Sequence, residues 1–384
     1  MPHRSIVILS VSAGAGHMRA AAALQAAFRE DHPDCEVIIL DTFKYTSPFL
    51  EKLILGAYME VLKYSPGVYG YIYSRSEKGS LSGYAKSEFS RLVSKFSAVR
   101  LQRFLDRHNP GAVICTHPFP LGVLSDLRRR GEYGYFTAAA VTDFIIHPFW
   151  VFPGIDLYLV GAGQLVGDLV GYGISGESVR ATGIPIDPVF ASPVDRRAVL
   201  CGYGLDPDLP TALIMGGGLG LGPLADSVRA LGSIRRRLQT IVVTGNNSDL
   251  RERIAQMAPG LANPVLALGY VDNINELMTS SDLLVSKAGG LSCAEALATG
   301  LPLFILDPLP GQEQRNSRFL VSAGAAVELN GVDDLVEKIS SSLDQPAKLQ
   351  EMSAAASRLG RPNAARETAG LILEKISDYY NQVM

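Results

Sequence analysis

Short apolar runs alternate with longer helix-forming segments in the first 150 residues of the chain. The apolar run at Ser5–Ser12 is followed by a Gly-rich turn, an Ala-rich segment over residues 18–30 and a second apolar run at Glu36–Asp41. This order predicts a strand, a helix and a parallel strand joined by a right-handed crossover. Further buried strands are expected at Ala112–Cys115 and Phe136–Val141.

The same pattern begins again near residue 211. Apolar runs alternate with helix-forming segments at Thr211–Met215, Thr240–Thr244, Val265–Leu268, Leu283–Val285 and Pro302–Leu306. Repeated alternation of this kind favours parallel sheets covered by helices. We therefore expect an α/β fold of two doubly wound, Rossmann-like domains that face a central cleft.

The expected joint between the domains lies in residues 183–200, a stretch that holds three prolines. We expect an N-terminal domain over residues 1–185, a C-terminal domain over residues 186–365, and a last helix over residues 366–384 that crosses back to the first domain. A chain of 384 residues suits two domains. Its composition, 47% hydrophobic and 19% charged, allows each domain a full core.

Charge and cysteine content argue against several classes of protein. The net charge of −3 is unlike that of a general nucleic-acid binder, which usually carries a strongly basic face. The four cysteines, Cys35, Cys115, Cys201 and Cys293, lie far apart without a C-x-x-C pair, so neither a zinc site nor a disulfide framework is expected. The sequence shows no signal-peptide pattern and no apolar run of roughly 18 residues. We expect a cytoplasmic protein that contacts membranes peripherally.

Residues 49–108 differ in composition from the segments around them. They contain six tyrosines, several Phe and Leu, and ten Lys or Arg against five Asp or Glu. Basic, aromatic and apolar side chains together are typical of a patch that binds an anionic membrane surface. The alternative is an ordinary helical excursion with a solvated basic face.

A first candidate site is the Gly-rich turn at residues 12–19 (SAGAGHMR). Glycines between a strand and a helix let main-chain N–H groups approach an anion or polar ligand, and His17 could act there as a general base near neutral pH. A dinucleotide site competes, because Asp41 ends the second strand where a ribose-binding acid would lie. However, Arg19 occupies the place of the third glycine of that fingerprint. A plain turn with an incidental histidine is the simplest alternative.

A second candidate is the glycine run at residues 216–222 (GGGLGLG), whose bare main chain can approach a diphosphate closely. The run lacks the Lys-Ser/Thr pair of a P-loop, so hydrolysis of a magnesium nucleotide is not expected. The pair Asp206 and Asp208 spells D-x-D, a pattern that can hold a divalent ion. It lies in a Pro-rich turn before a strand, and we interpret it as turn chemistry.

A third candidate combines residues 286–296 (SKAGGLSCAEA) with residues 300–316, which end in DPLPGQEQRN. A glycine turn opens a helix, and the Glu295 carboxylate could accept hydrogen bonds from two ribose hydroxyls. Gln312, Glu313 and Asn316 could bind the hydroxyls of a hexose. The alternatives are a solvated helix residue and a plain loop; turn and polar residues after a buried strand favour a ligand site.

A fourth candidate is the stretch Val141–Trp150 (VTDFIIHPFW). Asp143 and His147 follow a strand at the end where open sheets bind ligands. Trp150 is the only tryptophan of the chain. The alternatives are a capping aspartate, a histidine satisfied by its neighbours and an indole in the core.

Taken in order, these motifs resemble the family of monogalactosyldiacylglycerol synthases and processive diacylglycerol glucosyltransferases, which are relatives of the peptidoglycan undecaprenyl-linked N-acetylglucosaminyltransferase. The landmarks are SAGAGH, VTDFIIHPFW, TGIPI, GGGLGLG, SKAGGLSCAEA and DPLPGQEQRN, spread over residues 5–330. The resemblance implies a GT-B fold and an inverting, metal-independent reaction without a cofactor. The N-terminal domain would take the lipid acceptor, and the C-terminal domain would take the UDP-sugar.

The resemblance also implies roles for single residues. His17 matches the catalytic histidine of the family's first glycine loop, and we expect it, with Asp143, to accept the proton of the acceptor hydroxyl. Gly16, His147 and Trp150 are assigned to the acceptor side. The donor-binding positions are Gly217 and Gly218 (diphosphate), Val271 (uracil), Gly289, Gly290 and Glu295 (diphosphate and ribose), and Gln312, Glu313 and Asn316 (sugar). Leu219 and Asp187 depart from the residues common in the family, which puts the identity of the sugar in doubt.

The hypothesis from the sequence is therefore transfer of glucose or galactose from UDP-glucose or UDP-galactose to diacylglycerol or a glycosyl-diacylglycerol. We expect it to occur at the inner face of the cell membrane, with residues 49–108 contacting anionic lipid and with no nucleic-acid partner. The alternatives are N-acetylglucosaminyl transfer to an undecaprenyl-linked peptidoglycan precursor, a UDP-sugar 2-epimerase, and a non-catalytic nucleotide-sugar-binding protein.

Overall fold

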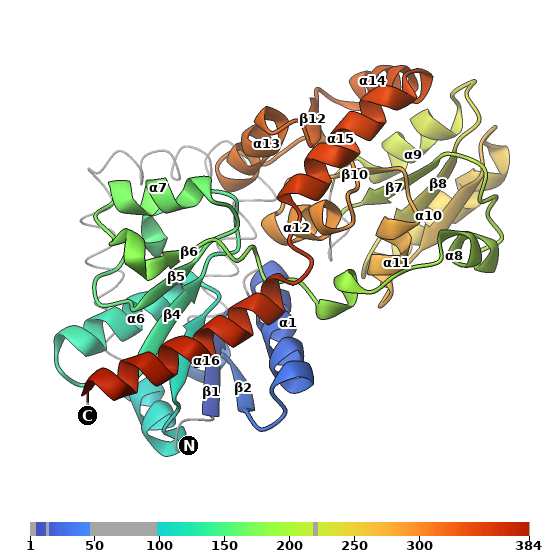
Figure 1. Ribbon diagram of the computed structural model, residues 1–384. Coiled ribbons are helices and arrows are strands. Elements are labelled where there is room, and N and C mark those ends of the chain that lie inside the picture. Colours follow the sequence, from blue (N-terminus) through green and yellow to red (C-terminus); the bar gives the residue numbers. More distant parts are fainter. Residues whose placement is uncertain (1–4, 13–14, 47–97, 218–221, 384) are drawn as a thin grey trace. The chain divides into compact units, whose positions relative to one another are not determined.

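The computed structural model describes residues 5–12, 15–46, 98–217 and 222–383 of the chain (Figure 1). The described chain divides into two units. The first contains Met1–Pro188, Pro310–Gln312 and Asn363–Met384, and the second contains Val189–Leu309 and Glu313–Pro362. The boundary between the units thus lies close to the one expected from the sequence, between residues 185 and 186.

The first unit is a parallel sheet with helices on its faces. Its strands are β1 (Ser5–Ser10), β2 (Glu36–Asp41), β3 (Ala112–Cys115), β4 (Phe136–Ala140), β5 (Leu157–Leu159) and β6 (Val179–Arg180). They lie in the order β2-β1-β3-β4-β5-β6, and every neighbouring pair is parallel. Because strands buried on both faces read as continuous apolar runs, this sheet produces the runs seen in the sequence.

The helices of the first unit lie between its strands along the chain, except for the last one, which follows the second unit. They are α1 (Ala15–Asp31), α2 (Thr42–Thr46), a helical segment over residues 98–108, α6 (Pro118–Arg129), α7 (Gln164–Gly171) and the last helix α16 (Ala364–Val383). Two short 3₁₀ turns, η1 (Pro148–Trp150) and η2 (Gly176–Ser178), belong to the same unit, and a third, η3 (Pro188–Ala191), spans the boundary to the second unit.

Helix α16 belongs to the first unit although it ends the chain, and it packs against α1 (Figure 1). Ala365, Ala369 and Ile372 are buried against the same core as Leu24 and Phe28 of α1. Burying a side chain such as Ile372 contributes roughly 1.5–3 kcal/mol. The helix therefore forms one layer of this unit.

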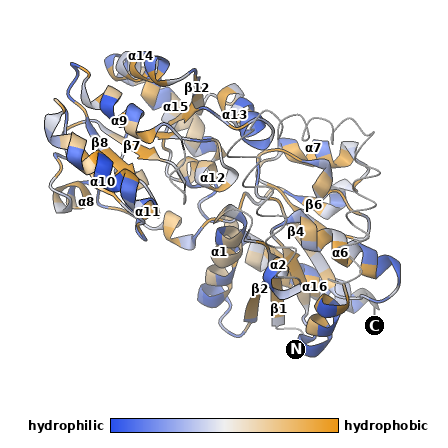
Figure 2. Ribbon diagram, turned by 180° about the vertical axis from the view of Figure 1, so that it is seen from behind, coloured by the Kyte–Doolittle hydropathy of each residue, from blue (hydrophilic) through white to orange (hydrophobic). Residues whose placement is uncertain are grey.

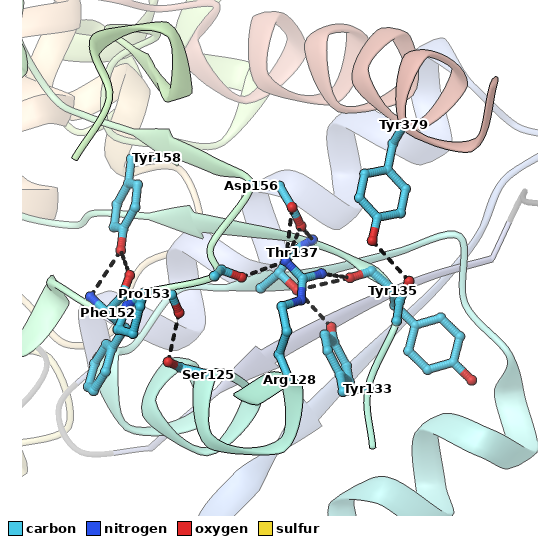
Figure 3. A network of polar contacts seen from close by, with 12 residues as sticks. Ser125, Arg128, Tyr133, Tyr135, Thr137, Phe152, Pro153, Asp156, Tyr158 and Tyr379 are labelled. Atoms are coloured by element: carbon cyan, nitrogen blue, oxygen red, sulfur yellow. Dashed lines mark hydrogen bonds and ion pairs between the residues drawn. The ribbon is translucent and has the colours of Figure 1, made fainter. Parts of the chain in front are cut away.

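Polar contacts fix the edge of the sheet where its strands begin (Figure 3). The Arg128 guanidinium of α6 donates to both carboxylate oxygens of Asp156, at 2.9 and 2.8 Å. Asp156 Oδ2 accepts from the main-chain N–H of Thr137, at 2.7 Å. From α16, the hydroxyl of Tyr379 donates to the Gly134 carbonyl at 3.2 Å. Helix α6, the strands β4 and β5, and α16 are thus held together far from the strands' carboxyl ends.

The second unit repeats the plan. Its strands are β7 (Thr211–Met215), β8 (Gln239–Val243), β9 (Val265–Leu268), β10 (Leu283–Ser286), β11 (Leu303–Leu306) and β12 (Ala326–Leu329). Their order is β12-β11-β10-β7-β8-β9, and all neighbouring pairs are parallel.

The helices of the second unit are α8 (Arg196–Gly202), α9 (Leu224–Gly232), α10 (Ser248–Met257), α11 (Ile274–Thr279), α12 (Gly290–Ala298), α13 (Gln312–Ser322), α14 (Val332–Asp344) and α15 (Pro346–Leu359), with a 3₁₀ turn η4 (Ala258–Gly260). Strands β7 and β8 are hydrophobic, whereas α10 is largely hydrophilic (Figure 2). Its one fully buried side chain, Ile254, contacts the core. Two doubly wound, Rossmann-like halves confirm the α/β fold class that the sequence predicted.

Candidate active site

Each sheet reverses its strand order once, and His17, Gly217 and Gly289 lie in or beside the loops at these reversals. In the first unit the chain moves outward from β1 to β2 and returns to add β3 on the other side of β1. In the second it moves from β7 through β8 to β9 and returns to add β10 beside β7. Open α/β sheets bind ligands outside the carboxyl ends of the strands at such switch points. The loops after β1 and β3, and after β7 and β10, are therefore the places to look for chemistry.

At the first switch point, His17 lies in the first turn of α1 and is held by residues of neighbouring strands. Its Nδ1 lies 2.8 Å from the carbonyl oxygen of Thr116 and 3.0 Å from the hydroxyl of Thr142. The Thr116 hydroxyl is within hydrogen-bonding distance of Ser10 Oγ, at 2.9 Å, and of the His17 carbonyl oxygen, at 3.1 Å. Residues at the ends of β1, β3 and β4 thus fix both the main chain and the ring of His17.

These contacts determine which nitrogen of His17 carries the proton. A carbonyl oxygen can only accept a hydrogen bond, so Nδ1 must donate to Thr116. The Thr142 hydroxyl oxygen then acts as a second acceptor, and in the neutral ring Nε2 keeps its lone pair. Burial lowers the pKa of His17, although the nearby Asp143 charge and the Thr116 hydrogen bond raise it in part. The ring is therefore neutral near pH 7 and able to accept a proton at Nε2.

Asp143 lies just beyond the end of β4 and is 9% exposed. Its charge acts on His17, which means that the two predicted catalytic residues are brought together within the first unit. Gln312, which groups with the first unit by its contacts, donates from Nε2 to Asp143 Oδ2 at 3.1 Å. A buried carboxylate beside a histidine stabilises the imidazolium that forms when the ring takes up a proton.

A second histidine, His117, was not singled out from the sequence. It follows the end of β3 directly after Thr116, and its ring centroid lies 4.6 Å from that of His17. Its Nδ1 accepts from the main-chain N–H of Phe119 at 3.1 Å, which makes His117 the N-cap of α6. The sequence could have indicated His117, because this residue closely follows the predicted strand at Ala112–Cys115 and so lies at the end of the sheet where ligands bind.

Of the residues assigned to the acceptor side, two have structural partners. His147 is 3% exposed, and its Nδ1 accepts from the main-chain N–H of Phe149 at 3.2 Å, so it caps the turn η1. Trp150 is 1% exposed and belongs to the hydrophobic core of the first unit. A side chain buried to this degree favours the alternative of an indole in the core over direct contact with the acceptor. Gly16 lies in the first turn of α1, next to His17.

At the second switch point the site consists mainly of backbone. Gly217 follows β7, is exposed, and has φ +68°, a left-handed conformation that favours glycine. Gly289 is the N-cap residue of α12, and no side chain caps that helix. The first main-chain N–H groups of α12, beginning at Gly290, are therefore available to an anion at the positive end of the helix. Because β7 and β10 are neighbours, both glycine turns lie at one edge of the sheet.

Lys287 was also not assigned a role from the sequence. It lies between β10 and α12, and its Cε would be 3.7 Å from a Cβ built on Gly222, at the end of the other glycine loop. In the described part of the chain, no carboxylate forms an ion pair with Lys287. A partly buried ammonium group therefore accompanies the bare main chain at this edge. The motif SKAGG could have indicated this role for Lys287, since a lysine beside a glycine turn is a typical anion ligand.

The predicted polar residues of the second unit are more buried than expected. Glu295 on α12 is 1% exposed, so the alternative of a solvated helix residue is wrong. Asn316 on α13 is fully buried, and its Nδ2 donates to the Ala288 carbonyl at 3.0 Å, which ties α13 to the turn before α12. Glu313 Oε2 accepts from the main-chain N–H of Leu309 at 2.9 Å. Asn316 and Glu313 therefore brace the two loops that surround the α12 N-terminus.

The remaining predicted positions are as follows. Val271 lies in the loop after β9, partly buried and next to Tyr270, which is 66% exposed. Gly218 lies outside the described residues, as does Leu219. The D-x-D pair forms a turn in which Asp206 Oδ1 accepts from the Asp208 main-chain N–H at 2.9 Å, as expected. Across the described ranges no cluster of three or more His, Cys, Asp or Glu side chains could hold a metal ion.

Of residues 49–108, which were expected to bind a membrane surface, the structure describes only the last part. Residues 49–97 lie outside the described residues, whereas residues 98–108 are helical. On that helix Val99, Arg100, Arg103 and Arg107 are exposed, and the arginines recur at a spacing of three and four residues. They therefore share one face of the helix. None of the helices in the described part of the chain combines the length and the apolar character needed to cross a bilayer.

Known proteins are similar to this chain over both units. Residues 17–186 match the family described as Monogalactosyldiacylglycerol (MGDG) synthase, and residues 211–368 match the Glycosyltransferase family 28 C-terminal domain. A processive diacylglycerol beta-glucosyltransferase of Bacillus pumilus is 30% identical over 351 residues, which cover 91% of this chain and 89% of that protein.

Two solved structures have the same fold. The MurG protein of Acinetobacter baumannii is 15% identical with a TM-score of 0.62, and the match covers 97% of this chain and 100% of that one. A putative UDP-N-acetylglucosamine 2-epimerase of Listeria monocytogenes is also 15% identical, with a TM-score of 0.63 and coverage of 99% and 98%. At this identity the likeness concerns the fold alone.

Proposed function

Because the chain belongs to the family of monogalactosyldiacylglycerol synthases and processive diacylglycerol glucosyltransferases, it is a glycosyltransferase, and we propose that it moves a hexose from a UDP-sugar to diacylglycerol or a glycosyl-diacylglycerol. The hexose is glucose or galactose. The observation that carries the proposal for this chain is the hydrogen bond between His17 Nδ1 and the Thr116 carbonyl oxygen. Because Nδ1 carries the proton of the neutral ring, Nε2 can accept a second proton.

In the proposed reaction the acceptor hydroxyl gives its proton to His17 Nε2 while its oxygen attacks the anomeric carbon of the sugar. The new bond forms on the face opposite the leaving group, so the configuration inverts. The bond from the anomeric carbon to the β-phosphate oxygen breaks, and UDP leaves with the electron pair. Asp143 stabilises the imidazolium by its charge. General-base assistance of this kind contributes typically about 10²–10⁴-fold to the rate.

The second unit would bind the leaving UDP. The growing negative charge on the β-phosphate would be met by the uncapped N-terminus of α12 and by Lys287, in a scheme that uses no metal. The bare main chain at Gly217 would allow close approach of the diphosphate. Val271 would meet the uracil ring, Glu295 the ribose, and the start of α13 the sugar.

The lipid acceptor implies action at a membrane surface. Burying acyl chains is worth ~0.8 kcal/mol per CH₂, so a two-chain lipid hardly leaves the bilayer and the enzyme must come to it. The exposed arginines of residues 98–108 form the described part of the surface that we propose contacts anionic lipid. We place this surface at the inner face of the cell membrane.

The decisive experiment is an incubation with labelled UDP-glucose and, separately, UDP-galactose, with diacylglycerol in detergent. Label in the lipid phase with one donor supports the proposal and identifies the sugar. A parallel reaction with UDP-N-acetylglucosamine and an undecaprenyl-linked acceptor tests the first alternative. An altered nucleotide-sugar formed without lipid would point to an epimerase, and binding without turnover would point to a binding protein; either result would refute the proposal.

A further inference from the structure

The two histidines of the first switch point differ in how the backbone holds them. His17 donates from Nδ1 to the Thr116 carbonyl, whereas His117 accepts at Nδ1 from the Phe119 N–H. Their rings meet edge to face, with an interplanar angle of 80°. In the neutral state His17 therefore carries its proton on Nδ1 and His117 carries its proton on Nε2. Two adjacent imidazoles are thus fixed in opposite tautomers.

This difference decides which ring can take up a proton. Protonation of His117 at Nδ1 would break the N-cap of α6 and would put a positive charge at the positive end of a helix. Protonation of His17 at Nε2 breaks neither of its hydrogen bonds. Burial, and secondarily the neighbouring His17, lower the pKa of His117 well below the usual range. His117 therefore stays neutral while His17 titrates.

The surroundings of the pair add few other charges. Asp143 beyond β4 faces His17. At the end of β2, Asp41 pairs with Lys44 at 3.7 Å, and on α1 itself Arg19 is exposed. Against His117 packs the aromatic ring of Phe43, with centroids 6.4 Å apart. The His117 ring thus lies next to both the His17 ring and an aromatic ring of α2.

From this geometry we propose that His117 is a positioning residue for His17. Its N-cap bond fixes the turn that carries the Thr116 carbonyl, and this carbonyl selects the His17 tautomer. Its ring excludes water from one side of His17. The catalytic consequence rests on the proposed function, in which His17 Nε2 takes the acceptor proton, whereas the tautomers and titration of the two rings do not depend on it.

Two substitutions separate the two parts of this role. Asparagine is a preferred N-cap, so His117→Asn keeps the cap and removes the ring. Phenylalanine keeps an aromatic ring beside Phe43 and removes the cap. In His117→Asn we expect water to reach His17 and to raise its pKa. The acid limb of the kcat/KM profile should then move to higher pH, while the plateau stays within about twofold of wild type. In His117→Phe we expect an unmoved acid limb and a plateau about fivefold lower, as for the loss of an N-cap.

The ring nitrogens can be followed without any substrate. The chain has six histidines, few enough to assign the imidazole ¹⁵N signals by single substitution. We expect a protonated Nδ1 on His17 and a protonated Nε2 on His117, with a higher His17 titration in His117→Asn. Unchanged His17 titration and pH–rate profiles in both variants would overturn the proposal.

A second result would overturn it in another way. If His117→Asn lost as much turnover as His17→Ala at every pH while remaining folded, His117 would itself be the proton acceptor. If the wild-type protein transferred no sugar, the proposed function would fail, and the ¹⁵N titration would still decide whether His117 tunes His17.

Discussion

The two units share one strand plan but present different chemistry at their switch points. In the first, the loops after β1 and β3 present side chains: two histidines, threonine hydroxyls and, beyond β4, a carboxylate. In the second, the loops after β7 and β10 present main chain, a left-handed glycine and an uncapped helix, with a single ammonium group beside them.

The difference follows from what each kind of group can do. Only a titratable side chain can remove a proton near pH 7, and its pKa must be adjusted by burial and neighbours. A diphosphate, by contrast, needs many donors in a small space, which a bare backbone supplies without changing its own charge. In the proposed reaction, the same fold would therefore serve proton transfer on one sheet and anion binding on the other.

The largest effect should come from removing the side chain that titrates. We expect His17→Ala to lower turnover by about 10²–10⁴-fold and to leave UDP binding unchanged, because only the general base is lost. Turnover in the lipid-phase assay and calorimetric titration with UDP measure the two quantities. His32→Ala, just after the end of the same helix, is the matched control and should behave as wild type. Wild-type turnover in a folded His17→Ala enzyme would refute the assignment.

A second contrast between the units concerns membranes. Arg103→Glu with Arg107→Glu reverses two exposed charges of the first unit. Since a basic residue near an anionic surface is worth about 1 kcal/mol, we expect at least a 30-fold loss of binding to phosphatidylserine-containing vesicles, measured by cosedimentation. Arg235→Glu with Arg237→Glu makes the same change at exposed positions of the second unit and should leave binding intact. Equal losses in both pairs would mean that net charge alone governs binding.

A smaller effect is expected from Lys287→Met, which keeps the stem of the side chain and removes its charge. The KM for the UDP-sugar should rise about tenfold, the lower end of the range for a hydrogen bond to a charged group, and the acid limb of the pH profile should not move. Steady-state kinetics at several pH values test this. Lys348→Met, at an exposed position of α15, is the control. A shift in the acid limb would show that Lys287 also affects proton transfer, so that proton transfer in the first unit and anion binding in the second are not separate.

The smallest effect should follow Gly217→Ala. A Cβ there meets no atom within 4 Å, so the expected cost comes from the left-handed φ alone. About 1 kcal/mol of strain corresponds to a roughly fivefold weaker affinity for UDP, measured by calorimetry. Gly202→Ala is the matched control, because a Cβ there is also unobstructed and its φ is not left-handed. If both substitutions had the same effect, the conformation of Gly217 would be irrelevant to the nucleotide.

The acid limb of activity gives one more test of the first unit. Because the His17 pKa lies below its ordinary value, the base stays neutral at neutral pH, and kcat/KM should fall only as the pH drops below about 6.5. If the acid limb of the pH profile of kcat/KM lay above about 6.5, burial would not be what sets the pKa of His17.

The fold could be predicted from the sequence where strands are long enough to form an apolar run. The two-residue strand β6 was missed because so short a segment carries no pattern, and β5 and β12 were not singled out either. The buried Glu295 could have been anticipated, because its neighbours Cys293, Ala296 and Leu297 make α12 apolar on all sides.

The placement of site residues was predictable where composition dictates a turn. Glycines after a buried strand located the loops that carry His17, Gly217 and Gly289. What the sequence could not supply was the partner of each polar side chain. Whether Trp150 packs or binds, and whether His117 caps a helix or remains open to a ligand, depends on neighbours far away in the chain.

Helix α16 returns the end of the chain to the unit in which the chain begins, so the chain passes between the two units near residues 188 and 363, and twice more around Pro310–Gln312. Neither unit is a continuous piece of the gene. A stop codon after the second sheet would leave that sheet intact but strip Ala365, Ala369 and Ile372 from the core around Phe28. Loss of residues 363–384 would thus destabilise the amino-terminal half first, and a fragment ending at residue 188 should become folded only when residues 363–384 are supplied in trans.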